Sequence, residues 1–182
     1  MRWSDLLAFF TSTFWLGCNT AFAIVPAVMF SAVKGKYVDA STEQVGELFG
    51  LVAMMWGNLT LGLLAVLALA RLAGWLIRLR HREFYRSSLI GIFLFAAIAV
   101  FTVLAARSYD HVEVHRSTLE DLDATSPERP AVAAQFALEH ERSVLLSKIL
   151  TALLLAQSVV LAVSLMRRSQ PSTRASATPI AA

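Results

Sequence analysis

Four stretches of the chain are long, apolar and almost free of charge. They run from Leu6 to Val33, from Leu48 to Ala70, from Leu89 to Ala106 and from Val144 to Met166, and Lys148 is the one charged residue inside them. Because a bilayer core about 30 Å thick takes roughly 20 helical residues to cross, each stretch is long enough for one transmembrane helix. The stretches lack the alternation of barrel strands. The sequence therefore predicts an all-α integral membrane protein, a four-helix bundle.

The composition supports lipid as the solvent of this chain. Hydrophobic residues make up 57% of the sequence and charged residues 16%, whereas about a quarter of the residues in soluble domains are charged. Ala21-Phe22-Ala23 resembles a signal-peptidase site, and Cys18 follows a short lipidation-like segment. Since the apolar run continues to Val33, we expect it to be retained as a helix. A single cysteine allows no internal disulfide.

Basic residues are distributed unevenly along the chain. Nine of the sixteen Lys and Arg residues, but only two of the thirteen acidic ones, lie at the two termini and between Arg71 and Ser88. The positive-inside rule then predicts a bacterial-type inner membrane protein with both termini in the cytoplasm. Trp75 and neighbouring apolar residues among these arginines favour an interfacial helix on anionic headgroups over a nucleic-acid site.

The segment from about residue 107 to 143 is predicted to be a helical hairpin. Val112, Leu119 and Leu122 recur at helical spacing after the third span, and Ser126-Pro127 indicates a turn before a fresh helix that runs into the fourth span. We expect helices three and four to extend out of the bilayer as an extracytoplasmic hairpin. Residues 1–168 would form the four-span domain, and 169–182 a disordered cytoplasmic tail.

Several polar residues interrupt the apolar runs and are candidates for hydrogen bonds between helices, which depend on such contacts in lipid. They are Asn19, Thr20, Asn58, Ser143, Ser147, Thr151 and Gln157. A structural role in packing is one interpretation. The other is a cavity for a small solute or ion, lined by Asn19, Asn58, Gln157 and the Phe22 carbonyl, which Pro26 would free by bending the helix. Small residues at Gly46, Gly50, Ala53 and Gly57 favour close packing of helix two.

Histidines and acids on the predicted hairpin form the cluster with ligand character. His111 and His115 lie one helical turn apart, a spacing that suits a shared metal ion, and the hairpin would bring His140 near them. The candidate metal ligands are His111, Glu113, His115 and His140, with Glu139 and Glu141 nearby. The bound group could be a copper ion. It could also be a haem held by His140 with His111 or His115. Motifs of ordinary soluble enzymes are missing, which argues against an enzyme.

Three segments of the sequence resemble one known family. They are FWLGCNTAFAIVPAVMFSAV in the first run, VGELFGLV at the start of the second, and FALEHERSVLL, which contains Phe136, Leu138, His140 and Ser143. Together they resemble the transmembrane-protein-205-like family, a four-span membrane domain of unknown function. The resemblance implies four spans over about residues 6–166. It also implies distant similarity to copper-resistance and haem-handling membrane proteins, which keeps the histidines as candidates.

Three functions follow from these patterns as hypotheses. The leading one is an accessory or scaffolding membrane protein whose hairpin contacts a membrane-protein partner or a second copy of the chain. The alternatives are a haem- or copper-binding protein that uses the histidines of the hairpin, and a small-solute transporter. The spans lack deep Asp, Glu, Arg or His residues, which argues against proton-coupled transport.

Overall fold

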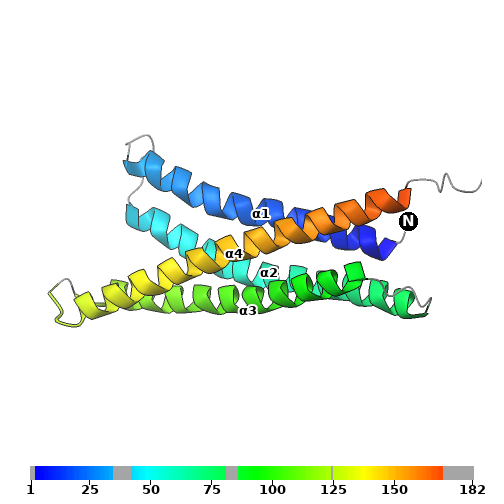
Figure 1. The fold of residues 1–182 in the computed structure, drawn as a ribbon. Coiled ribbons are helices and arrows are strands. Elements are labelled where there is room, and N and C mark those ends of the chain that lie inside the picture. Colours follow the sequence, from blue (N-terminus) through cyan, green and yellow to red (C-terminus); the bar gives the residue numbers. More distant parts are fainter. Residues whose placement is uncertain (1–2, 35–41, 81–85, 124, 170–182) are drawn as a thin grey trace, which may run out of the picture.

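The computed structural model describes residues 3–34, 42–80, 86–123 and 125–169, and these form four long helices (Figure 1). The helices are α1 (Trp3–Lys34), α2 (Thr42–Arg80), α3 (Arg86–Asp121) and α4 (Arg129–Ser169). The all-α prediction is confirmed. The predicted disordered tail lies outside the described residues, apart from Ser169.

The helices are arranged in a ring that follows the chain. α1 packs against α2 and α4, and α3 packs against α2 and α4, with the most extensive packing between α3 and α4. We call the end of the bundle where α1 begins and α4 finishes the termini end, and the end where α3 turns into α4 the hairpin end. Figure 1 shows that the α3–α4 hairpin extends past the adjacent ends of α1 and α2.

The turn between α3 and α4 is built from local hydrogen bonds. The Ser126 amide donates to the Asp123 carbonyl (3.0 Å), and the Arg129 amide donates to the Ser126 carbonyl (3.2 Å). The Arg129 side chain reaches back to the Leu119 carbonyl (3.0 Å), which lacks a helical partner at the end of α3. Pro130 stands in the first turn of α4, where its missing N–H costs nothing.

The outer surface of the bundle is apolar, and several polar residues lie in its interior, unlike in a soluble protein. On α1, Asp5, Ser12 and Asn19 are buried, whereas Phe10 and Phe14 are exposed on the other side of the helix. Each of the four helices is long and apolar enough to cross a membrane. The chain is therefore an integral membrane four-helix bundle whose exposed apolar side chains face lipid.

One boundary differs from the prediction. α2 does not end at Ala70 but continues to Arg80, so the segment expected to be a separate interfacial helix is the last part of α2. α1 is one continuous helix that includes Pro26. With 39 residues, α2 is about 58 Å long, which exceeds the thickness of the bilayer core. The helix must therefore either tilt in the membrane or extend its arginine-rich end beyond the core.

Candidate functional site

The centre of the bundle holds a hydrogen-bonded group around Asn19 of α1, which is completely buried. The Asn19 amide donates from Nδ2 to Thr151 Oγ1 (2.7 Å) and to the Ser147 carbonyl (3.3 Å), both on α4. Its Oδ1 accepts a hydrogen bond from Trp56 Nε1 of α2 (3.2 Å). One asparagine thus joins three helices.

Aromatic rings bring the fourth helix into this group. The Phe22 ring stacks on Trp56 at 5.7 Å and meets the edge of Tyr109, on α3, at 6.0 Å. The side chain of Tyr109 also interacts with that of Ser147. We call Asn19, Trp56, Tyr109, Ser147 and Thr151 the polar hub, because together they connect all four helices.

Helical spacing explains why these residues meet. On α1, the buried positions Ser12, Trp15 and Asn19 follow one another at intervals of three or four residues, as one helix face requires. On α4, Ser147 and Thr151 are four residues apart, and the Thr151 hydroxyl donates to the Ser147 carbonyl (2.8 Å). That bond fixes the Thr151 oxygen as the acceptor for Asn19.

The hub has the chemistry of a packing contact. All five side chains are neutral, and the Asn19 amide is bonded through both its nitrogen and its oxygen. A neutral, fully paired group offers neither a general base nor a nucleophile with an activating partner. Sequence reasoning found Asn19, Ser147 and Thr151, and missed Trp56 and Tyr109, whose polar atoms need a partner once their rings are buried.

The other predicted interhelical residues are placed differently. Thr20 is exposed, and its hydroxyl donates to the Leu16 carbonyl of its own helix (2.8 Å). Asn58 is exposed on α2, so the expectation that it faces the bundle interior is wrong. Ser143 is buried but donates to the His140 carbonyl of α4 (2.9 Å). The solute cavity predicted from Asn19, Asn58 and Gln157 is therefore not assembled.

Glycines of α2 pack against α3 within the chain. Gly57 lies under the Tyr109 ring, and a Cβ at Gly50 would stand 2.6 Å from Glu113 Oε2. Close approach of α2 and α3 therefore uses at least two of the small residues seen in the sequence.

The predicted metal ligands are not gathered into a site. No group of three or more His, Cys, Asp or Glu side chains within the described ranges is placed to hold a metal ion. Glu113 is bound by Arg116, whose nitrogens lie 2.6 Å from Oε1 and 3.0 Å from Oε2. His111 and His140 are exposed, His115 is half-buried, and the His140 ring stacks on Phe136 at 5.9 Å.

Asp5 of α1 and Arg71 of α2 are charged residues buried at the termini end. Asp5 and Arg71 are each 5% exposed. Asp5 lies against Gly74 of α2, and the Arg71 guanidinium lies against Gly91 of α3 and over the Trp75 ring at 5.5 Å. The expectation that Arg71 is one of the exposed interfacial arginines is wrong, because two glycines leave room for charged side chains between the helices.

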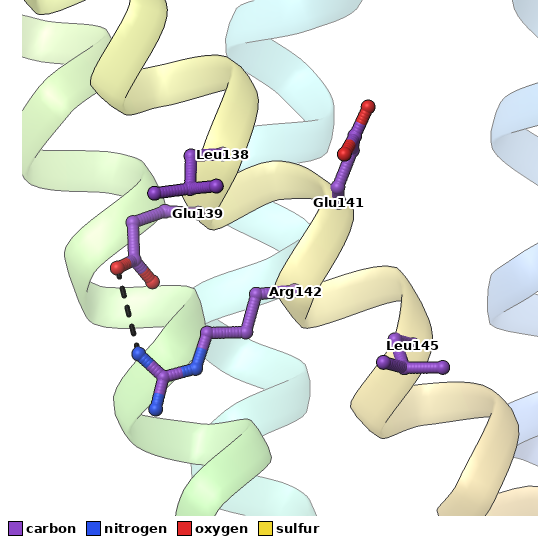
Figure 2. Close-up of a pocket in the computed structure, with 5 residues that line it drawn as sticks. All are labelled: Leu138, Glu139, Glu141, Arg142 and Leu145. Atoms are coloured by element: carbon purple, nitrogen blue, oxygen red, sulfur yellow. Dashed lines mark ion pairs between the residues drawn. The ribbon is translucent and has the colours of Figure 1, made fainter.

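A shallow hollow lies on the surface of α4 near the hairpin end (Figure 2). Its volume is about 460 Å³, and its lining residues are Leu138, Glu139, Glu141, Arg142 and Leu145. Leu138 is 66% and Leu145 57% exposed, and an ion pair of 3.6 Å joins Glu139 to Arg142. The hollow is thus an apolar patch with charged edges.

No protein-family model, curated protein or solved structure matches this chain. The fold and the hub define its class, an integral membrane four-helix bundle held together by neutral polar contacts.

Proposed function

We propose that this chain is an accessory membrane protein that binds another membrane protein through its α3–α4 hairpin. The proposal rests on one observation, the exposed Leu138 beside the hollow on α4, which continues to Leu145 at the start of the apolar span. The neutral, fully bonded hub supports it, because a centre of this kind serves packing and supplies no reactive group.

The position of these leucines along α4 makes their exposure informative. α4 has 41 residues and is about 61 Å long, roughly twice the thickness of the bilayer core. The part of α4 before Val144 carries Glu139, Glu141 and Arg142, so this part is the one that extends out of the hydrocarbon. Leu138 is exposed there without lipid to cover it, which is typical of a protein-binding surface, whereas Leu145 lies at the start of the apolar span.

The charges around the hollow favour an unlike partner over a second copy. Two copies inserted in the same orientation have parallel α4 helices, and contact through the Leu138–Leu145 face would bring their two Glu141 carboxylates together. Like charges across an interface oppose association. We therefore infer a partner that places an apolar residue in the hollow and a basic residue opposite Glu141.

The same proposal includes an orientation. The basic residues at the termini end support a cytoplasmic location for both termini, in a bacterial-type inner membrane, with the hairpin on the opposite side. A single cysteine introduced at Asp121 should then react with a membrane-impermeant thiol reagent in intact cells in a Cys18→Ala background. Labelling only after the cells are opened would reverse the orientation.

Photo-crosslinking in the native membrane tests the partner. A photoreactive amino acid at Leu138 should give a discrete adduct with a different protein. The matched control is Ala133, which is also exposed on α4 but lies about 140° around the helix. Glu141→Lys should reduce the adduct at Leu138 strongly. Equal adducts at both positions, an adduct of two copies of this chain, or insensitivity to Glu141→Lys would each contradict the proposal.

Haem or copper binding and solute transport stay predictions from the sequence. Optical spectra and elemental analysis of protein purified in mild detergent test the first. A Soret band or bound copper that disappears in His140→Ala would replace the accessory role with a cofactor-binding one.

A further inference from the structure

A tryptophan and a glutamine are among the completely buried polar side chains between the hub and the termini end. Trp15 of α1 and Gln157 of α4 are both 0% exposed. Neither the Trp15 indole nitrogen nor either atom of the Gln157 amide has a hydrogen-bond partner among the residues that the structure describes. Since about 90% or more of buried polar groups are hydrogen-bonded, such groups imply a partner from outside the chain.

Two serine hydroxyls, those of Ser12 and Ser158, are buried and unpaired as well. Serine and threonine in a helix can turn back to a carbonyl of their own helix, as Thr102 does to Ile98 at 2.7 Å. The indole N–H of Trp15 lies at the far edge of a rigid ring, so it cannot turn back to a carbonyl of its own helix as a hydroxyl can. Trp15 and Gln157 therefore define the site, and the serines add to it.

The geometry of the two helices brings these side chains to one level. α1 runs toward the hairpin end and α4 runs back toward the termini end (Figure 1). Starting from the contact of Asn19 with Thr151, Trp15 lies four residues back along α1 and Gln157 six residues onward along α4, which is about 6 Å and 9 Å in the same direction. Helical side chains lean toward the N-terminus of their helix, so along the bundle axis the two lean toward the same level, and because both are completely buried, both lie in the bundle interior.

We propose that Trp15 and Gln157 bind water in the interior of the bundle. The indole donates one hydrogen bond, and the amide both donates and accepts. A bound molecule that links them must accept a hydrogen bond from the indole and exchange one with the amide. It must also be neutral, because two neutral groups do not offset the cost of burying a charge. It must also be small, since the neighbouring core residues Leu150, Leu154 and Leu161 are buried and packed.

Water fits each of these requirements, and buried waters in proteins make about three hydrogen bonds each to groups of this kind. The site is independent of the proposed partner-binding function, because it lies in the bundle interior. A lipid hydroxyl offers the same hydrogen-bonding chemistry, and the test separates the two sources.

The chain contains its own control for this test. Trp56 is also a buried tryptophan, but its indole donates to Asn19 and needs no guest. Solid-state NMR on the full chain in lipid bilayers can follow polarisation transfer from water protons and from lipid protons to each indole N–H. Trp15→Phe and Trp56→Phe assign the two signals among the four tryptophans of the chain.

Transfer from water should build up severalfold faster at Trp15 than at Trp56. Equal transfer at the two indoles, or transfer to Trp15 from lipid protons alone, would overturn the proposal. Gln157→Leu removes one side of the site and should lower the transfer to Trp15 to the level of Trp56. An unchanged Trp15 signal in that variant would show that Gln157 does not hold the water. If Gln157→Leu does not fold, Gln157→Met is the replacement, and the comparison of the two indoles in the unaltered chain decides on its own.

Discussion

Replacement of Asn19 by alanine tests whether the polar hub holds the bundle together. The change removes the hydrogen bonds of the Asn19 side chain to Thr151, to the Ser147 carbonyl and from Trp56. Interhelical hydrogen bonds in membrane proteins average about 0.6 kcal/mol, so the three together contribute about 2 kcal/mol. The variant also leaves the buried Trp56 indole without an acceptor, which costs about 1–3 kcal/mol. Because the two terms overlap, we expect a loss of about 2–4 kcal/mol in the free energy of unfolding.

Reversible unfolding in mixed micelles of SDS and a mild detergent, followed by far-UV circular dichroism, measures this loss. Asn58→Ala is the matched control, because it deletes the same side chain from an exposed position on α2. We expect Asn58→Ala to leave stability unchanged or to raise it slightly, since it removes an amide from a lipid-facing surface.

A double-mutant cycle isolates the central bond of the hub. Asn19→Ala and Thr151→Val, combined, should show a coupling of about 0.6–1.7 kcal/mol, the range measured for hydrogen bonds between membrane helices. A coupling of zero, or equal stability of the Asn19 and Asn58 variants, would refute the view that the hub joins the helices.

Two further changes probe the packing and the hairpin. Gly91→Ala places a Cβ against the buried Arg71 guanidinium, which would have to shift, so we expect a loss of about 1–3 kcal/mol from overpacking. Gly62→Ala meets open space and should stabilise α2 by roughly 0.5–1 kcal/mol through helix propensity. The same unfolding assay compares them, and equal midpoints would contradict the close contact at Gly91. Arg129→Ala frees the Leu119 carbonyl and should speed amide hydrogen exchange in the last turn of α3 while the middle of α3 stays protected. Unchanged exchange in that turn would exclude a capping role for Arg129.

The helices of the bundle could be predicted from the sequence because lipid imposes simple requirements on a chain. A run of about twenty apolar residues has few alternatives to a spanning helix. Helical spacing of Val112 and Leu119 also predicted that α3 continues past its most apolar part, and Ser126-Pro127 marked the turn before α4. The resemblance to the transmembrane-protein-205-like family stays a prediction, because it rests on the three short sequence segments.

The direction in which each polar side chain points was harder to predict. Apolar residues lie on both sides of a membrane helix, so the hydrophobic pattern does not distinguish the interior from the lipid. Hydroxyls do not distinguish them either, because Thr20 satisfies its bond with the Leu16 carbonyl of its own helix. An asparagine in an apolar run predicts an interior position more strongly than a hydroxyl does. This prediction was right for Asn19 and wrong for Asn58. Nothing in the structure explains why Asn58 faces outward.

The sequence could not predict which residue of another helix pairs with a given polar group. The burial of Arg71 depends on Gly91, which lies in another helix and twenty residues later. Likewise, the role of Trp56 depends on the Asn19 oxygen that accepts its hydrogen bond. A tryptophan in an apolar run is counted as hydrophobic, although its N–H needs a partner as soon as the ring is buried.

The neutrality of the hub has a consequence for how the bundle holds its arrangement. Lipid tails are as apolar as leucine, so burial of apolar surface does little to choose one alignment of α1 against α4 over another. A shift of α1 by one turn would move the Asn19 amide about 5.4 Å from Thr151 and leave both it and the Trp56 indole unpaired inside the protein. The hub therefore sets the register of the helices. Because its members carry no charge, this register should be insensitive to salt, whereas the Glu113–Arg116 ion pair on α3 weakens as salt rises.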